Sequence, residues 1–285
     1  MKLLAIETTD RRGTVAAMED GRFLLEKELE PEDQRSAQSL VPTIDRLLKE
    51  LNWSLSELNL IAAAAGPGSF TGLRVGLTTA KVLAYALNIR MVGVDTLEAM
   101  AAGLVESVPG RTVAVAVDAQ RGEVAARRFR ITSDGPEPLD ERFRIIPVSQ
   151  WLGLNTSSKS AEVVPSLNSH QTDSKNRDCV KNTEESNVIH SGVIYERDND
   201  KKPENSGSAD LFCSPVLKHQ EAKVPVELLK RFVAESCRYP RARYVAEVAW
   251  RKDATSDRDE KWTLLPVYSR KSAAEEKAEA AGKFD

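Results

Sequence analysis

The stretch that decides the fold runs from Leu60 to Asn88 and reads LIAAAAGPGSFTGLRVGLTTAKVLAYALN. It predicts a short buried strand over residues 60–65, a glycine-rich bend over residues 66–72 and a helix over residues 73–87. Glycine permits positive φ and close approach of another backbone, and a hydroxyl in the bend can cap the helix. The bend lacks the lysine of a phosphate-binding P-loop. Its candidate functional residues are Gly66, Gly68, Ser69, Thr71 and Gly72, with an ordinary α/β connection as the open alternative.

The predicted helix has two apolar sides. Leucines and alanines at a spacing of three and four make one stripe, which suits the core of the helix's own domain. Small and β-branched residues make a second stripe: Val75, Thr79, Val82 and Ala86. A helix that is apolar on two sides needs two partners, so the second stripe indicates a neighbouring helix or another protein.

Around this stretch the pattern predicts an α/β fold. Three antiparallel strands are expected over residues 3–6, 14–18 and 23–30, followed by a helix that begins near Ser39 or kinks at Pro42. A turn at 54–58 and strands at 60–65 and 91–94 complete a mixed sheet of the ribonuclease H type. The motif of apolar strand, acid, Arg-Gly and strand then recurs after residue 113 as a short internal repeat, with coincidence as the alternative. The repeat predicts a second, related subdomain.

We therefore expect two subdomains, residues 1–103 and residues 104–285. The second is interrupted at residues 155–215, where polar residues prevail and no apolar period is sustained, so we predict a disordered insertion there. Helices are expected afterwards over residues 224–237, 241–250 and 272–281.

Composition excludes several classes of function. The chain has 285 residues, a net charge of -3 and 29% charged residues, so bulk charge does not favour nucleic acid or an anionic membrane. Its apolar runs are too short to span a membrane, and its three cysteines show no zinc spacing. We expect a cytoplasmic protein with no metal site of its own. His170, His190 and His219 share no metal-ligand spacing.

Two acids end apolar strands, Glu7 and Asp118. In a cleft between two subdomains such acids could hold magnesium or orient a water molecule. The alternative is that each acid binds amides of its own loop, as acids in turns often do. Because no histidine precedes His170, activation of a nucleophile by histidine is absent from the first half of the chain.

Five segments resemble the TsaB (YeaZ-like) family. The resemblance covers residues 1–152 well and residues 238–275 loosely, and its most specific part is the glycine-rich bend. The five segments are LAIETT at residues 4–9, AGPGSFTGLRVG at 65–76, VGVDTLEA at 92–99, DAQRGEV at 118–124 and LPVYSR at 265–270.

This resemblance implies an actin/Hsp70-like fold of two ribonuclease H-like subdomains. It implies a non-catalytic subunit for the synthesis of N6-threonylcarbamoyladenosine at position 37 of tRNAs that read codons starting with A. The implied partners are a TsaD-like catalytic subunit, a TsaE-like ATPase, TsaC as the source of threonylcarbamoyl-adenylate, and tRNA through the complex alone. ATP, ADP and metal are expected on partner subunits, so the chain would hold no cofactor.

In that family the dimer contact uses the N-terminal helices, so the resemblance places these residues at the interface: Leu40, Ile44, Leu47, Val75, Thr79, Val82 and Ala86. The family usually has Asp where this chain has Glu7, and often His where it has Ser36. Glu7 and Asp118 are then vestigial acids of a cleft. Two alternatives remain at this point: an independent ATPase, kinase or glycopeptidase of the same fold, and a homodimeric binding protein.

Overall fold

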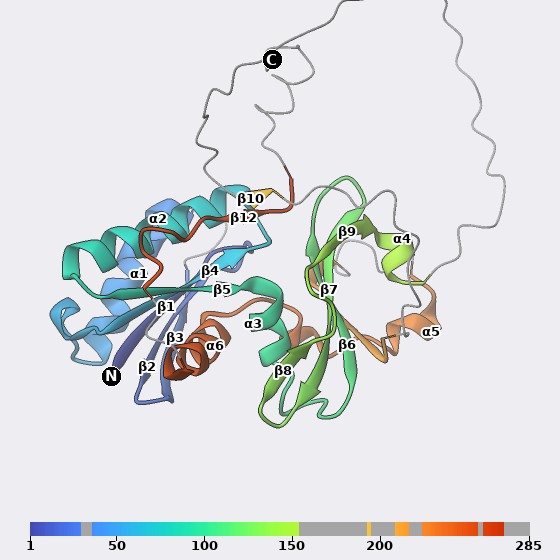
Figure 1. The fold of residues 1–285 in the computed structure, drawn as a ribbon, viewed down its shortest axis with the longest axis horizontal. Coiled ribbons are helices and arrows are strands. Elements are labelled where there is room, and N and C mark those ends of the chain that lie inside the picture. Colours follow the sequence, from blue (N-terminus) through green and yellow to red (C-terminus); the bar gives the residue numbers. More distant parts are fainter. Residues whose placement is uncertain (30–35, 154–192, 195–208, 217–223, 256–258, 271–285) are drawn as a thin grey trace, which may run out of the picture.

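The structure is a computed structural model that describes residues 1–29, 36–153, 193–194, 209–216, 224–255 and 259–270. Its first sheet has the order β3-β2-β1-β4-β5. β1 is antiparallel to β2 and parallel to β4, so the sheet is mixed, as the sequence predicts (Figure 1). Its strands are β1 (Lys2–Glu7), β2 (Thr14–Glu19), β3 (Arg22–Glu28), β4 (Leu60–Gly66) and β5 (Arg90–Asp95).

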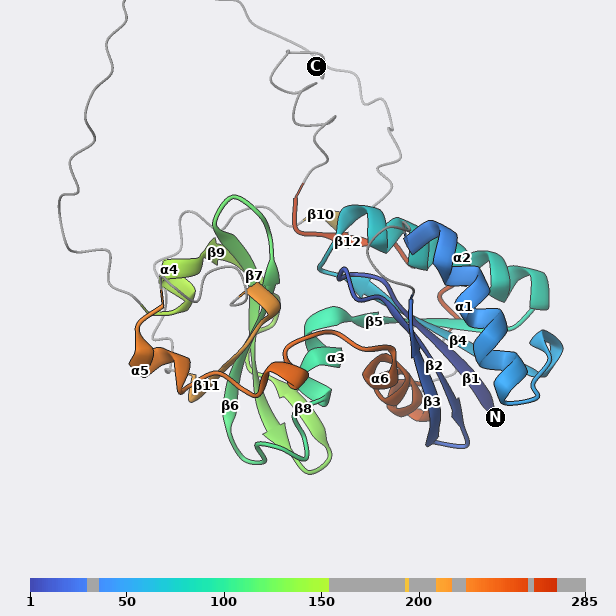
Figure 2. The same cartoon turned by 180° about the vertical axis from the view of Figure 1, so that it is seen from behind.

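Helices cover both faces of this sheet. α1 (Ser36–Glu50) and α2 (Phe70–Leu87) pack on one face, and α6 (Ala242–Thr255) packs on the other. Leu4 and Ile6 of β1 point toward α1 and α2, whereas Leu3 and Ala5 point toward α6. Because successive side chains of a strand point to opposite faces, a strand covered on both sides is apolar throughout. Figure 2 shows α1 and α2 side by side over the sheet.

The two helices begin earlier than the sequence pattern indicates. α1 starts at Ser36, so of the two alternatives the start near Ser39 is wrong. Pro42 lies inside the helix, and a kink there stays a prediction. α2 starts at Phe70, because the Ser69 hydroxyl accepts a hydrogen bond from the backbone N–H of Gly72 and caps the helix. The predicted turn near residue 55 is the 3-10 helix Leu55–Glu57.

The second sheet repeats the pairing of the first. β6 (Thr112–Asp118) is antiparallel to β7 (Glu123–Thr132) and parallel to β11 (Leu211–Cys213), as β1 is to β2 and β4. β8 (Gly135–Pro138) and β9 (Arg144–Pro147) both pair with β7. β1 ends in Glu7 and β6 ends in Asp118, and the two strands pair with their neighbours in the same directions. This confirms the two ribonuclease H-like units with mixed sheets that the short sequence repeat predicts.

Part of the expected insertion belongs to this sheet. β11 pairs with the central strand β6, and Phe212 is buried, so the predicted end of the insertion at residue 215 is wrong. Before residue 209, the part of the insertion that the structure describes is Val193–Ile194 (β10), which pairs with β12 (Val267–Tyr268). The three histidines, Cys179 and the helix expected at 272–281 lie outside the described residues.

A continuous helix over residues 224–237 is also a wrong prediction. Only α5 (Val226–Leu229) and the 3-10 turn Glu235–Cys237 are helical there. Between them, the carbonyl of Arg231 accepts from the N–H of Phe212, and the N–H of Val233 donates to the carbonyl of Phe212. Pairing with β11 therefore replaces the middle of the helix, while the apolar side chains still reach the core.

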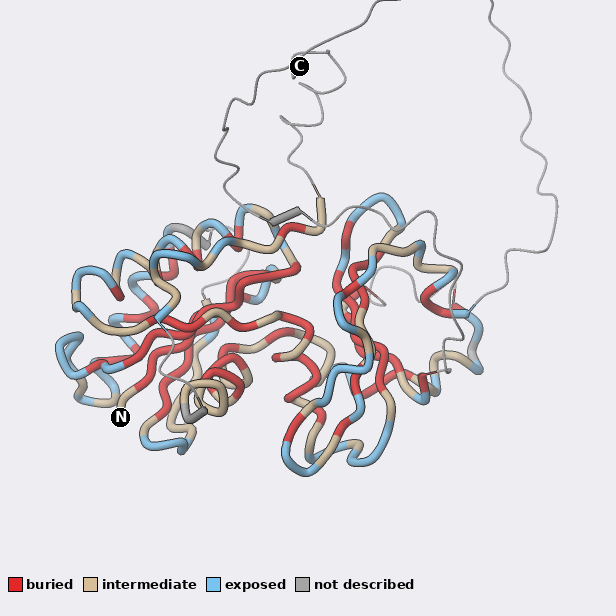
Figure 3. The backbone as a smooth tube through the Cα atoms, in the orientation of Figure 1, coloured by how far each residue is buried: buried red, intermediate tan, exposed pale blue. Residues whose placement is uncertain are grey.

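α3 (Thr96–Ala102) lies between the two sheets. Ala99 and Ala102 pack on the first sheet, whereas Leu97 and Met100 pack on the second. Figure 3 shows buried backbone running through both sheets and α3. On the outer face of the second sheet, α4 (Val148–Trp151) contributes Trp151 to a separate aromatic core. A subdomain boundary at residue 103 stays a prediction.

Among the residues that the structure describes, no helix combines the length and the apolar character needed to cross a bilayer.

Candidate functional site: a filled glycine-rich joint and an exposed apolar face

The glycine-rich bend is a joint in which the chain packs against itself. A Cβ added at Gly72 would lie 1.8 Å from the carbonyl oxygen of Thr8, and one at Gly68 would lie 2.5 Å from Cβ of Thr9. The Thr8 hydroxyl donates to the Gly72 carbonyl at 2.7 Å, and the Ser69 N–H donates to the Thr9 carbonyl at 2.8 Å. The glycines thus serve the close approach of the β1–β2 loop to α2.

A segment from the end of the chain occupies the other side of the joint. We call residues 259–270 the strap; in Figure 1 it is drawn in red and runs beside α2. The Val267 carbonyl oxygen lies 2.2 Å from where a Cβ at Gly66 would be, and Gly66 has a φ of +113°. Near the start of α2, the ring of Tyr268 lies 4.6 Å from that of Phe70, and Tyr268 accepts a hydrogen bond from Arg74 Nε at 3.1 Å. Thr71, also a candidate residue of the loop, is exposed.

Glu7 is fully buried at the end of β1. Its Oε1 accepts from the backbone N–H of Thr9 at 2.6 Å and from the Thr9 hydroxyl, whereas its Oε2 has no hydrogen-bond partner among the described residues. Burial raises the pKa of Glu7 to about 8, although the bonds from Thr9 oppose the rise. The side chain is therefore mainly protonated at neutral pH, and a neutral acid is a poor ligand for magnesium.

Asp118 ends β6 as Glu7 ends β1, but its side chain is exposed. Its Oδ1 accepts from the backbone N–H of Gln120 at 2.7 Å. Each acid thus accepts from the backbone amide two residues further along the chain. This is the alternative to a metal or water site that the sequence left open, in which each acid binds amides of its own loop. Among the described residues no three His, Cys, Asp or Glu side chains group as a metal site.

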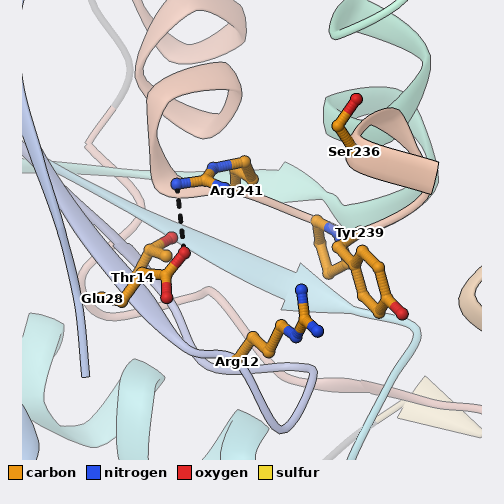
Figure 4. A pocket seen from close by; sticks show the side chains of 7 residues that line it. Arg12, Thr14, Glu28, Ser236, Tyr239 and Arg241 are labelled. Carbon is orange, nitrogen blue, oxygen red and sulfur yellow. Dashed lines mark ion pairs between the residues drawn. The ribbon is translucent and has the colours of Figure 1, made fainter. Parts of the chain in front are cut away.

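A pocket of about 160 Å³ lies beside the β1–β2 loop (Figure 4). Arg12 enters it from the loop and stacks on the ring of Tyr239 at 4.6 Å. Arg241 pairs with Glu28 at 3.5 Å, and Thr14 accepts from the backbone N–H of Ala242 at 2.7 Å. These contacts tie the first residues of α6 to β2 and β3, so the pocket lines a structural connection.

The outward side of α2 is the main apolar surface of this region. Val82 is 58% exposed and Ala86 is exposed, whereas Val75 and Thr79 are partly buried at the edge of the core. The helix therefore has apolar surface that its own fold does not hide, as its second stripe indicates.

The residues expected at the interface on α1 need a correction. Leu40, Ile44 and Leu47 are buried against the first sheet, because they form the inward stripe of the helix. Among the described side chains of α1, the large apolar one that is exposed is Val41. Val41 follows the buried Leu40 directly in the sequence, and a broad apolar stripe does not show which of its edges meets solvent.

Sequence reasoning also missed an aromatic pair on this surface. Trp262 of the strap lies against Tyr85 of α2, with ring centroids 5.4 Å apart and planes at 78°. Tyr85 is 65% exposed and Trp262 is 70% exposed. The two residues are 177 positions apart in the chain, and no local pattern links them.

The fold and these surfaces define a class: two-unit, ribonuclease H-like proteins with a filled glycine-rich joint. A family model described as "TsaD: tRNA N6-adenosine threonylcarbamoyltransferase" matches residues 30–278. The tRNA threonylcarbamoyladenosine biosynthesis protein TsaB of Escherichia coli (strain K12) is 32% identical over 168 residues, which are 55% of this chain and 71% of that protein. The chain belongs to the TsaB (YeaZ) family.

Two further comparisons agree. The protein TsaB of Bacillus subtilis (strain 168) is 32% identical over 130 residues, 44% of this chain and 53% of that protein. The solved structure "YeaZ from Pseudomonas aeruginosa" is similar in fold, with a TM-score of 0.63 and 21% identity over 94% of this chain and 99% of that one.

Proposed function

We propose that this chain is a non-catalytic subunit in the synthesis of N6-threonylcarbamoyladenosine at position 37 of tRNAs that read codons starting with A. Its task is to bind and activate a TsaD-like catalytic subunit through the outward face of α2. In this proposal a TsaE-like ATPase and TsaC act in the same pathway, tRNA is bound through the complex, and the chain needs no cofactor of its own.

The observation that carries the proposal is the exposed apolar side of α2. A buried helix hides its apolar residues, and a solvent-facing helix carries polar residues on its outer side. The exposed Val82 on α2 therefore favours a protein partner. Family membership supports the pathway, since the relatives carry its name. The match to the TsaD family model supports the choice of a TsaD-like partner within that pathway.

The joint and Glu7 argue for a role without chemistry in this chain. The space beside Gly66 and Gly72 is filled by backbone of Val267 and Thr8, which leaves no cradle for phosphate oxygens at these two glycines. Glu7 is buried and mainly neutral at pH 7. An enzyme that bound a nucleotide or its metal ion at these two places would need them open to a charged ligand.

The test is reconstitution of tRNA modification from purified TsaD-like, TsaE-like and TsaC subunits with tRNA and ATP. We expect modification that depends on this chain and that is retained when Glu7→Gln replaces the wild type. Hydrolysis of ATP by this chain alone, lost in Glu7→Gln, would instead establish the enzyme alternative. A reaction that proceeds equally well without the chain would contradict the proposed role.

A further inference from the structure

The strap holds an exposed tryptophan in a fixed position. The backbone N–H of Glu260 donates to the Met91 carbonyl at 2.8 Å, and Glu260 Oε2 accepts from the N–H of Gly93 at 2.7 Å. The N–H of Leu264 donates to the carbonyl of Glu260 at 2.8 Å, which closes a turn around Trp262. The backbone that carries Trp262 is therefore tied to β5, although the side chain itself faces solvent.

Trp262 extends the apolar side of α2. Tyr85 follows Val82 by three positions, so their side chains are neighbours on the helix surface. Tyr85 in turn contacts Trp262 through the edge-to-face ring pair. Among the described residues, five of the seven large apolar side chains that are exposed belong to α1, α2 or the strap: Val41, Val82, Tyr85, Trp262 and Leu265.

We propose that Tyr85 and Trp262 form the anchor that seats in an apolar pocket of the TsaD-like subunit. This inference rests on the proposed function and adds a third segment, the strap, to the helical face. Tyrosine and tryptophan are enriched at the energetic centres of interfaces, because their large rings bury much area at little entropic cost. Here the strap's bonds already hold the backbone of Trp262 against β5, so less of the chain must be ordered on binding.

The TsaD-like subunit fits this face better than an unrelated partner. The TsaD family model matches residues 30–278, a range that includes both α1 and α2, so the catalytic family is related in sequence to the part of this chain that carries the face. If the related face of the partner packs against α2, Trp262, which lies against Tyr85 of that helix, would be covered in the same contact. A second copy of this chain is the competing occupant.

The experiment measures the affinity of the full chain for the TsaD-like subunit of the same organism by isothermal titration calorimetry. Trp262→Ala and Tyr85→Ala are each expected to raise Kd at least tenfold, whereas Trp262→Phe, which keeps a ring, is expected to stay within threefold. Leu139→Ala is the control, since Leu139 is an exposed apolar residue of the second unit, 43% exposed. Because both anchor side chains face solvent, thermal melting should be unchanged in every variant.

A spectroscopic arm follows the ring itself. Trp262 is the most exposed of the chain's four tryptophans, so its emission is expected to shift to shorter wavelength when the partner covers it. The shift should be absent in Trp262→Phe, even though that variant still binds.

The outcomes separate the anchor from the function. If Val82→Arg abolishes binding while Trp262→Ala and Tyr85→Ala stay within twofold of wild type, the helical face stands and the anchor is wrong. If Val82→Arg also binds as wild type does, the proposed face itself is wrong. If the two alanine variants weaken self-association in sedimentation but not binding of the TsaD-like subunit, the occupant is a second copy and the proposal is overturned.

Discussion

Glu7 takes up a proton when the chain folds. Its pKa is about 8 in the folded protein against an ordinary value of 4.5, because burial disfavours the charged form. Between these two pH values the unfolded chain has lost the proton and the folded chain holds it. The free energy of unfolding therefore falls as pH rises through this window, by up to about 1.4 kcal/mol per pH unit from this group.

Glu7→Gln tests this linkage. Glutamine keeps an oxygen that can accept from Thr9 but cannot ionise, so the variant should lack the fall in stability that Glu7 causes. Urea unfolding at pH 5.5 and 7.5 should show a smaller difference for Glu7→Gln than for the wild type, by roughly 2 kcal/mol. Equal pH dependence in the two proteins would show that Glu7 is ionised in the fold.

Gly72→Ala tests the filled joint. Helix propensity alone makes an alanine in α2 more stable than a glycine by about 1 kcal/mol. We expect the opposite sign, a loss of ~1–3 kcal/mol, because the new Cβ would meet the Thr8 carbonyl oxygen. Thermal or chemical unfolding measures it, with Thr71→Ala at an exposed position as the neighbouring control. A stabilised Gly72→Ala would mean that the loop and helix are not in contact.

At the residue scale, local backbone structure can be predicted from the sequence better than the tertiary contacts of each residue can. The strand, the glycine bend and the hydroxyl cap follow from local rules that Gly66, Pro67 and Ser69 satisfy. That Thr8 and Val267 fill the bend does not follow from them, because these contacts join residues far apart in the chain. The burial of Glu7 was missed for the same reason.

At the scale of elements, β11 is the strand that completes the second sheet. Phe212 packs its ring 5.1 Å from that of Trp151 and 5.4 Å from that of Phe232, inside the outer core of that sheet. Phe212→Ala should therefore cost ~3–5 kcal/mol of unfolding free energy. The exposed Leu139→Ala should cost less than about 0.5 kcal/mol in the same unfolding assay. A small loss at Phe212 would remove β11 from the folded core.

The elements that sequence reasoning misjudged share one cause. Residues 224–237 have helical apolar spacing, but the backbone at Phe232 and Val233 pairs with β11 instead of continuing a helix. β11 is separated from these residues in the sequence and comes beside them only when the chain folds. β11 itself is three residues long and follows a polar stretch, so the composition of this region gives no sign of a strand. Tertiary contacts decide such short segments, whereas α2, with 18 residues, is decided by its own pattern.

At the scale of the whole molecule, the two units are joined mainly on one side. α3 packs between the sheets, Arg127 of β7 bonds Asp95 at 3.3 Å, and Arg270 of the strap pairs with Glu123. The outward side of α1 and α2 takes no part in these contacts between the units. The apolar face is therefore not used to join the two units, which leaves it available for a partner.

The central claim is that the outward face of α2 binds a TsaD-like subunit, and the affinity of Val82→Arg for that subunit tests it most directly. Val82 faces solvent in the free chain, so the variant should fold and melt as the wild type does. In a complex the arginine would be buried without a partner, and we expect Kd to rise at least ~100-fold, about 2.7 kcal/mol. Leu139→Arg, the matched control on the second unit, should bind within twofold of wild type. Wild-type affinity in Val82→Arg would contradict the claim.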